Sequence, residues 1–199
     1  MGYEVTPNDS RYIPFTQQKL CCVPTSISMI MYRNNIPLIP IEELGYHLGL
    51  VLSPEDGKLF FNPRISETPP EVGYGTQIQY DEYDPNKVFV RLNIPLSFQR
   101  IAPGEISNGS DLIKKLNDIV DNNKDAVLCF DYNTLHGIKS DRNCGHIVVF
   151  DRVIDGKVRI IDPECNRPKW QTYDADIMLE AMKRHERFSG GVWLFTKSQ

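Results

Sequence analysis

The stretch Gln17-Gln18-Lys19-Leu20-Cys21-Cys22-Val23-Pro24-Thr25-Ser26 decides how the rest of the sequence is interpreted. It leads two adjacent cysteines into an apolar helix, which the 3.6-residue spacing predicts over residues 23–33. A helix N-terminus offers free backbone N–H groups and the positive end of the helix dipole, both of which stabilise a thiolate. The stretch therefore predicts a nucleophilic cysteine, which requires a basic histidine and a group that orients that histidine.

Composition and charge narrow the function classes. The 199 residues suit one domain, 1–199, and the net charge of −4 with scattered lysines and arginines argues against a nucleic-acid partner. The sequence contains no apolar run long enough to predict a membrane span. It also contains no basic segment followed by an apolar stretch, the pattern that predicts a secretory signal. Five cysteines without a framework of regular spacing favour reduced thiols, so we expect a cytoplasmic protein.

The chain divides by pattern into three parts of an α+β fold. Residues 1–49 form an irregular arm followed by two helices, at 23–33 and 40–48. Residues 50–109 are rich in proline and aromatic side chains, which predicts an ordered, loop-rich insertion or lid with a short strand at 87–92. Residues 110–199 predict helices at 110–122 and 174–185, strands at 126–130, 146–153, 157–161 and 191–196, and a loop after Pro163.

A hairpin in the third part supplies the residues that the cysteine requires. Asp155-Gly156 is a two-residue turn signal between two apolar strands, so His146 and Asp162 are brought to the same end of the sheet. His146 lies nine residues before Asp155, whereas Asp162 lies six after Gly156. The mismatch predicts a bulge, a longer turn, or a residue beyond strict pairing.

These residues carry a family resemblance. Cys22-Val23-Pro24-Thr25-Ser26, Gly145 to Phe150 and Ile160-Ile161-Asp162-Pro163 resemble the papain-like cysteine peptidases, above all the double-glycine leader peptidase branch, over residues 12–36 and 124–196. The resemblance implies a papain-like fold with Cys22 as nucleophile, His146 as base and Asp162 as orienting carboxylate. It also implies that Gln17, with Gln18 as the alternative, donates its amide to the oxyanion hole.

The expected activity is acyl transfer from a peptide, small amide or thioester through a thioester on Cys22, without a cofactor. If water accepts the acyl group from the thioester, the protein is a peptidase or amidase. If an amine accepts it, the protein is an acyltransferase. Cys21 remains an alternative nucleophile. Val23 replaces the usual glycine after the nucleophile, so a catalytically inactive binding module remains an alternative function. A zinc site is a rival hypothesis, with its ligands drawn from Cys21, Cys22, Cys144, His146 and Cys165.

Three weaker expectations concern single residues. Cys144 and Cys165 could pair as a disulfide across the hairpin ends. His185 ends a predicted helix, where the dipole favours a cation. Trp170 and Trp193 are expected in the core or in a groove wall.

Overall fold

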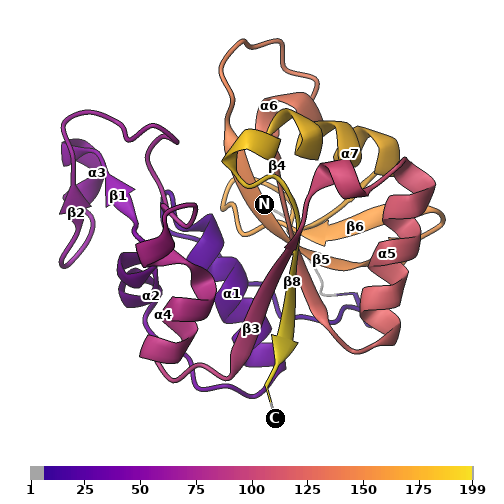
Figure 1. Ribbon diagram of the computed structural model, residues 1–199, viewed down its shortest axis with the longest axis horizontal. Coiled ribbons are helices and arrows are strands. Elements are labelled where there is room, and N and C mark those ends of the chain that lie inside the picture. Colours follow the sequence, from indigo (N-terminus) through magenta and orange to yellow (C-terminus); the bar gives the residue numbers. More distant parts are fainter. Residues whose placement is uncertain (1–6, 199) are drawn as a thin grey trace.

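A computed structural model describes residues 7–198, and it consists of a six-stranded antiparallel sheet with helices on both faces (Figure 1). The strand order is β3-β8-β4-β5-β6-β7. The helices are α1 (Cys22–Arg33), α2 (Ile41–His47), α3 (Pro54–Gly57), α4 (Pro85–Arg91), α5 (Gly109–Asp121), α6 (Tyr132–Leu135) and α7 (Ala175–Arg184), with 3₁₀ turns η1 (Asp81–Tyr83), η2 (Pro103–Glu105) and η3 (Glu186–Phe188). The strands are β1 (Val51–Leu52), β2 (Arg64–Ile65), β3 (Leu96–Ile101), β4 (Asp125–Asp131), β5 (Gly145–Ile154), β6 (Lys157–Ile161), β7 (Trp170–Tyr173) and β8 (Gly191–Lys197).

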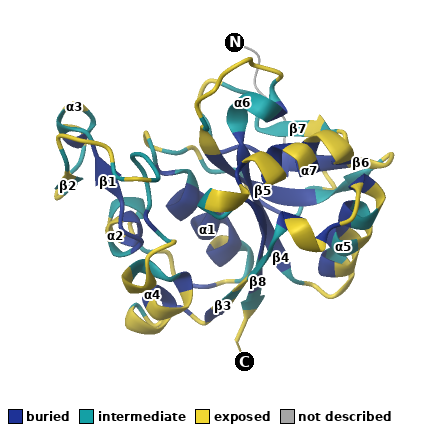
Figure 2. Cartoon of the chain, turned by 45° about the horizontal axis from the view of Figure 1, so that its top comes forward, coloured by how far each residue is buried: buried dark blue, intermediate teal, exposed yellow. Residues whose placement is uncertain are grey.

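Two apolar cores lie on opposite faces of the sheet (Figure 2). Helix α1 packs on one face, where Ile27 and Ile30 belong to the same cluster as Ile147 of β5. Helices α5 and α7 cover the other face through Leu112, Leu116, Met178 and their neighbours. The alternation of side chains along β4 and β5 serves both faces, which is why β4 is buried throughout and β5 is buried from His146 to Asp151.

Helix α1 is more deeply enclosed than its spacing predicted. Every residue from Val23 to Met31 is buried, not only the apolar stripe. The helix begins at Cys22 after Leu20, whose φ of 63° turns the chain, and Pro24 stands in the first turn, where its missing N–H leaves no helical bond unmade. Enclosure on all sides fixes the position of the Cys22 backbone.

The predicted hairpin is confirmed in detail. Asp155 and Gly156 both have left-handed φ angles, of 48° and 73°, as a type I′ turn requires. The register shifts between Phe150 and Arg152, which places a bulge at Asp151, and pairing with β5 ends at Ile161. The mismatch therefore arises from a bulge together with a residue beyond strict pairing, not from a longer turn.

Two predicted elements are wrong. The stretch 87–92, predicted as a strand, lies in helix α4, because Asp84 caps its N-terminus through the N–H groups of Asn86 and Lys87 and Pro85 occupies the first turn. The strand of this region follows it, at Leu96–Ile101. The predicted loop after Pro163 contains strand β7, which pairs with β6.

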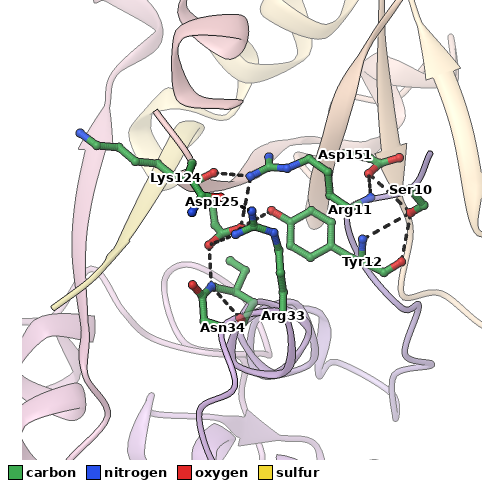
Figure 3. A network of polar contacts seen from close by, with 10 residues as sticks. Ser10, Arg11, Tyr12, Arg33, Asn34, Lys124, Asp125 and Asp151 are labelled. Atoms are coloured by element: carbon green, nitrogen blue, oxygen red, sulfur yellow. Dashed lines mark hydrogen bonds and ion pairs between the residues drawn. The ribbon is translucent and has the colours of Figure 1, made fainter. Parts of the chain in front are cut away.

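The irregular arm is held by a buried polar network (Figure 3). Asp125 at the start of β4 accepts hydrogen bonds from the Tyr12 hydroxyl at 2.5 Å and from Arg33 at 2.9 Å. Arg11 donates to the Lys124 carbonyl oxygen at 2.6 Å. The part of the arm before residue 7 lies outside the described residues. The network joins the arm, the end of α1 and the start of β4, which keeps α1 in register with the sheet.

None of the helices within residues 7–198 combines the length and the apolar character that crossing a bilayer requires.

Candidate active site

Cys22 is the first residue of α1 and is half-buried, whereas the adjacent Cys21 has no exposed surface. Burial, with smaller contributions from Cys22 and Glu42, raises the pKa of Cys21 to about 12. A thiol with this pKa stays protonated near neutral pH and cannot be reached from solvent. Of the two adjacent cysteines, only Cys22 is placed to react.

His146 lies between Cys22 and Asp162. Its Nε2 is 2.8 Å from Asp162 Oδ1, and its side chain lines the same cavity as Cys22, which also acts on its pKa. Because Nε2 is occupied by Asp162, Nδ1 is the ring nitrogen that remains for the thiol. Burial alone lowers the pKa of His146, but the hydrogen bond to Asp162 and the influence of Cys22 outweigh it and raise the pKa to about 10. The imidazole therefore carries a proton at neutral pH.

Asp162 is fixed by contacts with two further residues. Its Oδ1 accepts the Glu164 backbone N–H at 2.9 Å, and its Oδ2 accepts Gln171 Nε2 at 3.3 Å. Burial raises the pKa of Asp162, but the hydrogen bond from His146 and these donors lower it below its ordinary value. Gln171 in turn accepts the Tyr173 hydroxyl at 2.5 Å. The sequence pattern does not indicate Gln171 and Tyr173 as partners, because it predicts a loop where β7 lies.

The two glutamines before the cysteines point in different directions. Gln17 Nε2 donates to Glu164 Oε2 at 2.9 Å, and the Gln17 backbone N–H donates to the Pro163 carbonyl oxygen. Gln18 Nε2 donates to Glu42 on α2 at 3.0 Å. Gln17 therefore lies beside the loop that carries Asp162, and Gln18 is turned away from that loop.

Aromatic side chains surround the imidazole of His146. The rings of Phe130 and Tyr132 meet it edge to face, with centroids 5.9 and 5.8 Å away. The ring of His136 packs against Tyr132 with centroids 4.3 Å apart and an interplanar angle of 56°, and burial lowers the pKa of His136. This apolar shell limits water around the His146–Asp162 hydrogen bond, which strengthens that bond.

Cys22 and His146 open into a cavity of about 120 Å³. Its other walls come from three parts of the chain: residues 72–79 of the insertion, residues 145–147 at the start of β5, and the region around His185, Phe188 and Trp193. A larger cavity of about 640 Å³ lies between α2 and residues 60–64 and reaches Gln18 but no residue of the triad. We assign the smaller cavity as the candidate site because it alone of the two contains the reactive groups.

The remaining site hypotheses have different outcomes. Val23 lines the cavity with 5% of its surface exposed, and Trp193 lines it as well, whereas the Trp170 indole N–H donates to Ser10. Cys144 and Cys165 are exposed free thiols and are not paired. Within residues 7–198, no three His, Cys, Asp or Glu side chains converge to hold a metal ion.

One residue of the cavity differs from its sequence-based interpretation. His185 follows α7 as predicted, but it is only 7% exposed. Burial lowers its pKa to about 4, against the attraction of Asp131. It is therefore neutral at pH 7, and the expectation of a cation stabilised by the helix dipole is wrong, because desolvation outweighs the dipole.

No protein-family model and no curated protein matches the sequence. Among solved structures, the chain is similar to a candidate C39-like peptidase from Bacillus anthracis, with a TM-score of 0.57 and 16% identity over 94% of this chain and 96% of that chain. It is also similar to the peptidase domain of Streptococcus ComA, a bifunctional ABC transporter of a quorum-sensing pathway, with a TM-score of 0.50 and 14% identity over 94% of this chain and 98% of that domain. The chain therefore has the papain-like α+β fold of C39-like peptidases, as the sequence resemblance implied.

Proposed function

We propose that the protein is a cysteine peptidase-type hydrolase that cleaves a peptide or a small amide through a thioester on Cys22. The observation that carries the proposal is the placement of His146, which bonds Asp162 through Nε2 and shares a cavity with Cys22. A likeness of fold to peptidases supports the same class of reaction. The reactivity of the Cys22 thiol tests the proposal directly.

Acylation begins from a thiolate beside an imidazolium. In the proposed step, the Cys22 thiolate attacks the scissile carbonyl carbon, and His146 then gives its proton to the leaving amine. Asp162 holds the ring so that Nδ1 faces the reacting atoms and stabilises the positive charge. The carbon–nitrogen bond breaks as the thioester forms, and the amine leaves as the first product.

The oxyanion is stabilised by two donors in this proposal. One is the backbone N–H of Cys22, at the N-terminus of α1, where no helical acceptor is available. The other is Gln17 Nε2, which carries two hydrogens, one of which is bonded to Glu164. Glu164 thereby fixes the plane of the Gln17 amide while it leaves the second hydrogen for the substrate.

Deacylation reverses the roles of the same groups. Neutral His146 takes a proton from water, the hydroxide attacks the thioester carbonyl, and the Cys22 thiolate leaves as the carboxylic acid product forms. The triad is then ready for a second substrate without any cofactor.

We propose that residues 72–79 of the insertion form a wall of the substrate cleft. They line the cavity that contains Cys22. Gly75 pairs with Val51 through two backbone hydrogen bonds of 2.9 Å, and Gln77 Nε2 donates to the Gly73 and Gly75 carbonyl oxygens at 3.0 Å. The segment is thus anchored to β1 and presents a defined surface to a substrate.

The test is the rate at which iodoacetamide alkylates each cysteine near neutral pH, followed by mass spectrometry of the peptides. Cys22 should react much faster than the exposed thiols Cys144 and Cys165, and His146→Ala should remove the difference. Cys165→Ala is the matched control and should leave the Cys22 rate unchanged. A Cys22 rate equal to that of the exposed thiols, or unchanged in His146→Ala, would refute the catalytic proposal.

A further inference from the structure

A second histidine, His185, shares the cavity with Cys22 and His146. It lies between α7 and η3, and its ring packs beside Phe188 at a centroid distance of 5.7 Å. It has no role in the proposed acyl transfer. With only 7% of its surface exposed, it is too deeply buried to be explained as an ordinary surface residue.

The position of the proton on His185 follows from its neighbour. Asn143 Nδ2 donates to the Arg184 carbonyl oxygen at 2.8 Å, so its Oδ1 is the atom that faces His185 Nδ1. An amide oxygen only accepts, and Nδ1 must therefore carry the hydrogen. In the neutral ring, Nε2 is then left as a bare acceptor.

The acceptor edge of His185 lies against the residue that precedes the base. A Cβ atom placed on Gly145 would lie 2.6 Å from both Cε1 and Nε2 of His185, so only glycine leaves room for the ring. Asp131 and Arg100 are the charged groups that act on His185, and burial outweighs the attraction of Asp131 and keeps the pKa at about 4. The neutral form, with its lone pair on Nε2, is therefore the form present at neutral pH.

The Nε2 lone pair has no hydrogen-bond partner among the described residues, whereas Nδ1 is bonded to Asn143. Because His185 lines the cavity, this acceptor is open to a ligand. A hydrogen bond that a ligand makes to it in exchange for water contributes about 0.5–1.5 kcal/mol. The cavity that Cys22 lines thus offers an unused acceptor.

We propose that His185 Nε2 accepts a hydrogen bond from a backbone N–H of the substrate that flanks the scissile carbonyl. This makes His185 a specificity residue for substrates with a peptide backbone, and the inference rests on the proposed function of the same site. A peptide presents such an N–H next to its carbonyl group, whereas a simple ester or thioester does not. The residue therefore favours peptide-like substrates over acyl groups that lack the donor.

The experiment compares two electrophiles and one small probe on Cys22. N-acetyl-Ala-Ala chloromethyl ketone carries the N–H, and its depsipeptide analogue has an ester oxygen in place of that N–H. Iodoacetate carries no donor at neutral pH and reports only the thiol and its base. We expect the wild-type protein to react about 2 to 10 times faster with the amide than with the ester, the factor that 1.4 kcal/mol per tenfold gives for a bond of this strength.

Three variants locate the effect. In His185→Phe the amide and the ester should react at the same rate, whereas the rate with iodoacetate should stay at its wild-type value. His185→Gln, which places an acceptor oxygen near the position of Nε2, should recover part of the preference. His47→Phe, on α2 and outside the cavity, should leave all three rates unchanged.

Three results would overturn the proposal. One is a ratio of amide to ester rates near one in the wild-type protein, a result that does not depend on any variant. The second is a wild-type ratio preserved in His185→Phe, and the third is an equal loss with all three probes in a folded His185→Phe protein, which would show a structural role. Failure of the proposed function is recognised separately, because iodoacetate would then alkylate Cys22 at the same rate in the wild type and in His146→Ala.

Discussion

Replacing Asp162 with asparagine removes the charge opposite His146 and keeps a similar shape. The amide oxygen of the new side chain could still accept from His146 Nε2 and from the Glu164 N–H, the two donors that bond Oδ1 at 2.8 and 2.9 Å. Its new NH₂ group would face Gln171 Nε2, which now donates to Oδ2 at 3.3 Å. Rotation of the Gln171 amide to meet it would break the bond that Gln171 Oε1 accepts from Tyr173.

The expected shift in the pKa of His146 follows from its hydrogen bond to residue 162, whose acceptor loses its charge in the variant. A hydrogen bond to a charged group contributes about 1.5–3 kcal/mol, and one pH unit corresponds to about 1.4 kcal/mol. His146 now has a pKa raised to about 10. Asp162→Asn should therefore lower the pH at which His146 loses its proton by about 1 to 2 units.

The assay is the ratio of alkylation rates of Cys22 by iodoacetate and iodoacetamide between pH 5 and pH 11. An imidazolium attracts the anionic reagent, so the ratio is high while His146 is protonated and falls as the proton leaves. The wild-type ratio should fall near pH 10, and the fall should move to lower pH in Asp162→Asn.

The matched control is Asp155→Asn, the same change at the exposed turn of the same hairpin, where a left-handed φ of 48° suits asparagine. The control should leave the midpoint of the fall unchanged. If the midpoint in Asp162→Asn coincides with that of the wild type, Asp162 does not hold the proton on His146 and the reasoning is refuted.

Three other perturbations have defined outcomes. Asp125→Ala should lower the free energy of unfolding by about 3–5 kcal/mol in urea, because Arg33 loses its buried partner and the Tyr12 hydroxyl its acceptor; a loss below about 1 kcal/mol would contradict this. The free energy of unfolding of the wild type should fall as the pH drops from 6.5 to 4, because the unfolded chain binds a proton on His185 at a higher pH than the folded chain. In His185→Phe this fall should be smaller by about 3 kcal/mol. Identical dependence on pH in the two proteins, measured by chemical denaturation, would argue against it. Gly145→Ala should displace the His185 ring and reduce the amide preference of the chloromethyl ketone pair, and an unchanged preference would show that the two residues do not meet.

The positions of Cys22, His146 and Asp162 could be predicted because each lies on a locally specified element. A cysteine before an apolar helix marks the start of α1, and Asp155-Gly156 fixes the turn that brings the ends of β5 and β6 together. The counting mismatch between His146 and Asp162 predicts an irregularity in this hairpin, and the bulge is one of the three alternatives that it leaves open. These features depend on residues close together in the chain, so sequence alone carries them.

The wrong predictions arise where the surrounding structure overrides the preference of the local residue pattern. The β-branched and aromatic run Val88-Phe89-Val90 favours a strand, but Asp84 and Pro85 start a helix that buries Val88 and Phe89. Strand β7 forms only because β6 offers it an edge. At His185 the helix dipole favours a cation, and burial, which no local pattern reveals, reverses the sign.

The site divides between parts that are fixed in different ways. Cys22 stands on a helix enclosed by the core, and His146 and Asp162 stand at the end of a hairpin whose strands are buried in the sheet. Residues 72–79 of the cavity wall belong to no helix or strand and are tied mainly through Gly75 and Gln77. The backbone hydrogen bonds of that wall reach β1 and the end of α2, whereas Ile78 packs on the core cluster that contains Val23 and Ile147. Substitutions that keep Ile78 therefore change the shape of the cavity without disturbing the packing of α1 and β5. If the proposed function holds, selection of the substrate and the chemistry of the thiol are separable, and exchange of residues 72–79 with Ile78 kept should alter which peptides react while the rate of Cys22 with iodoacetate stays the same.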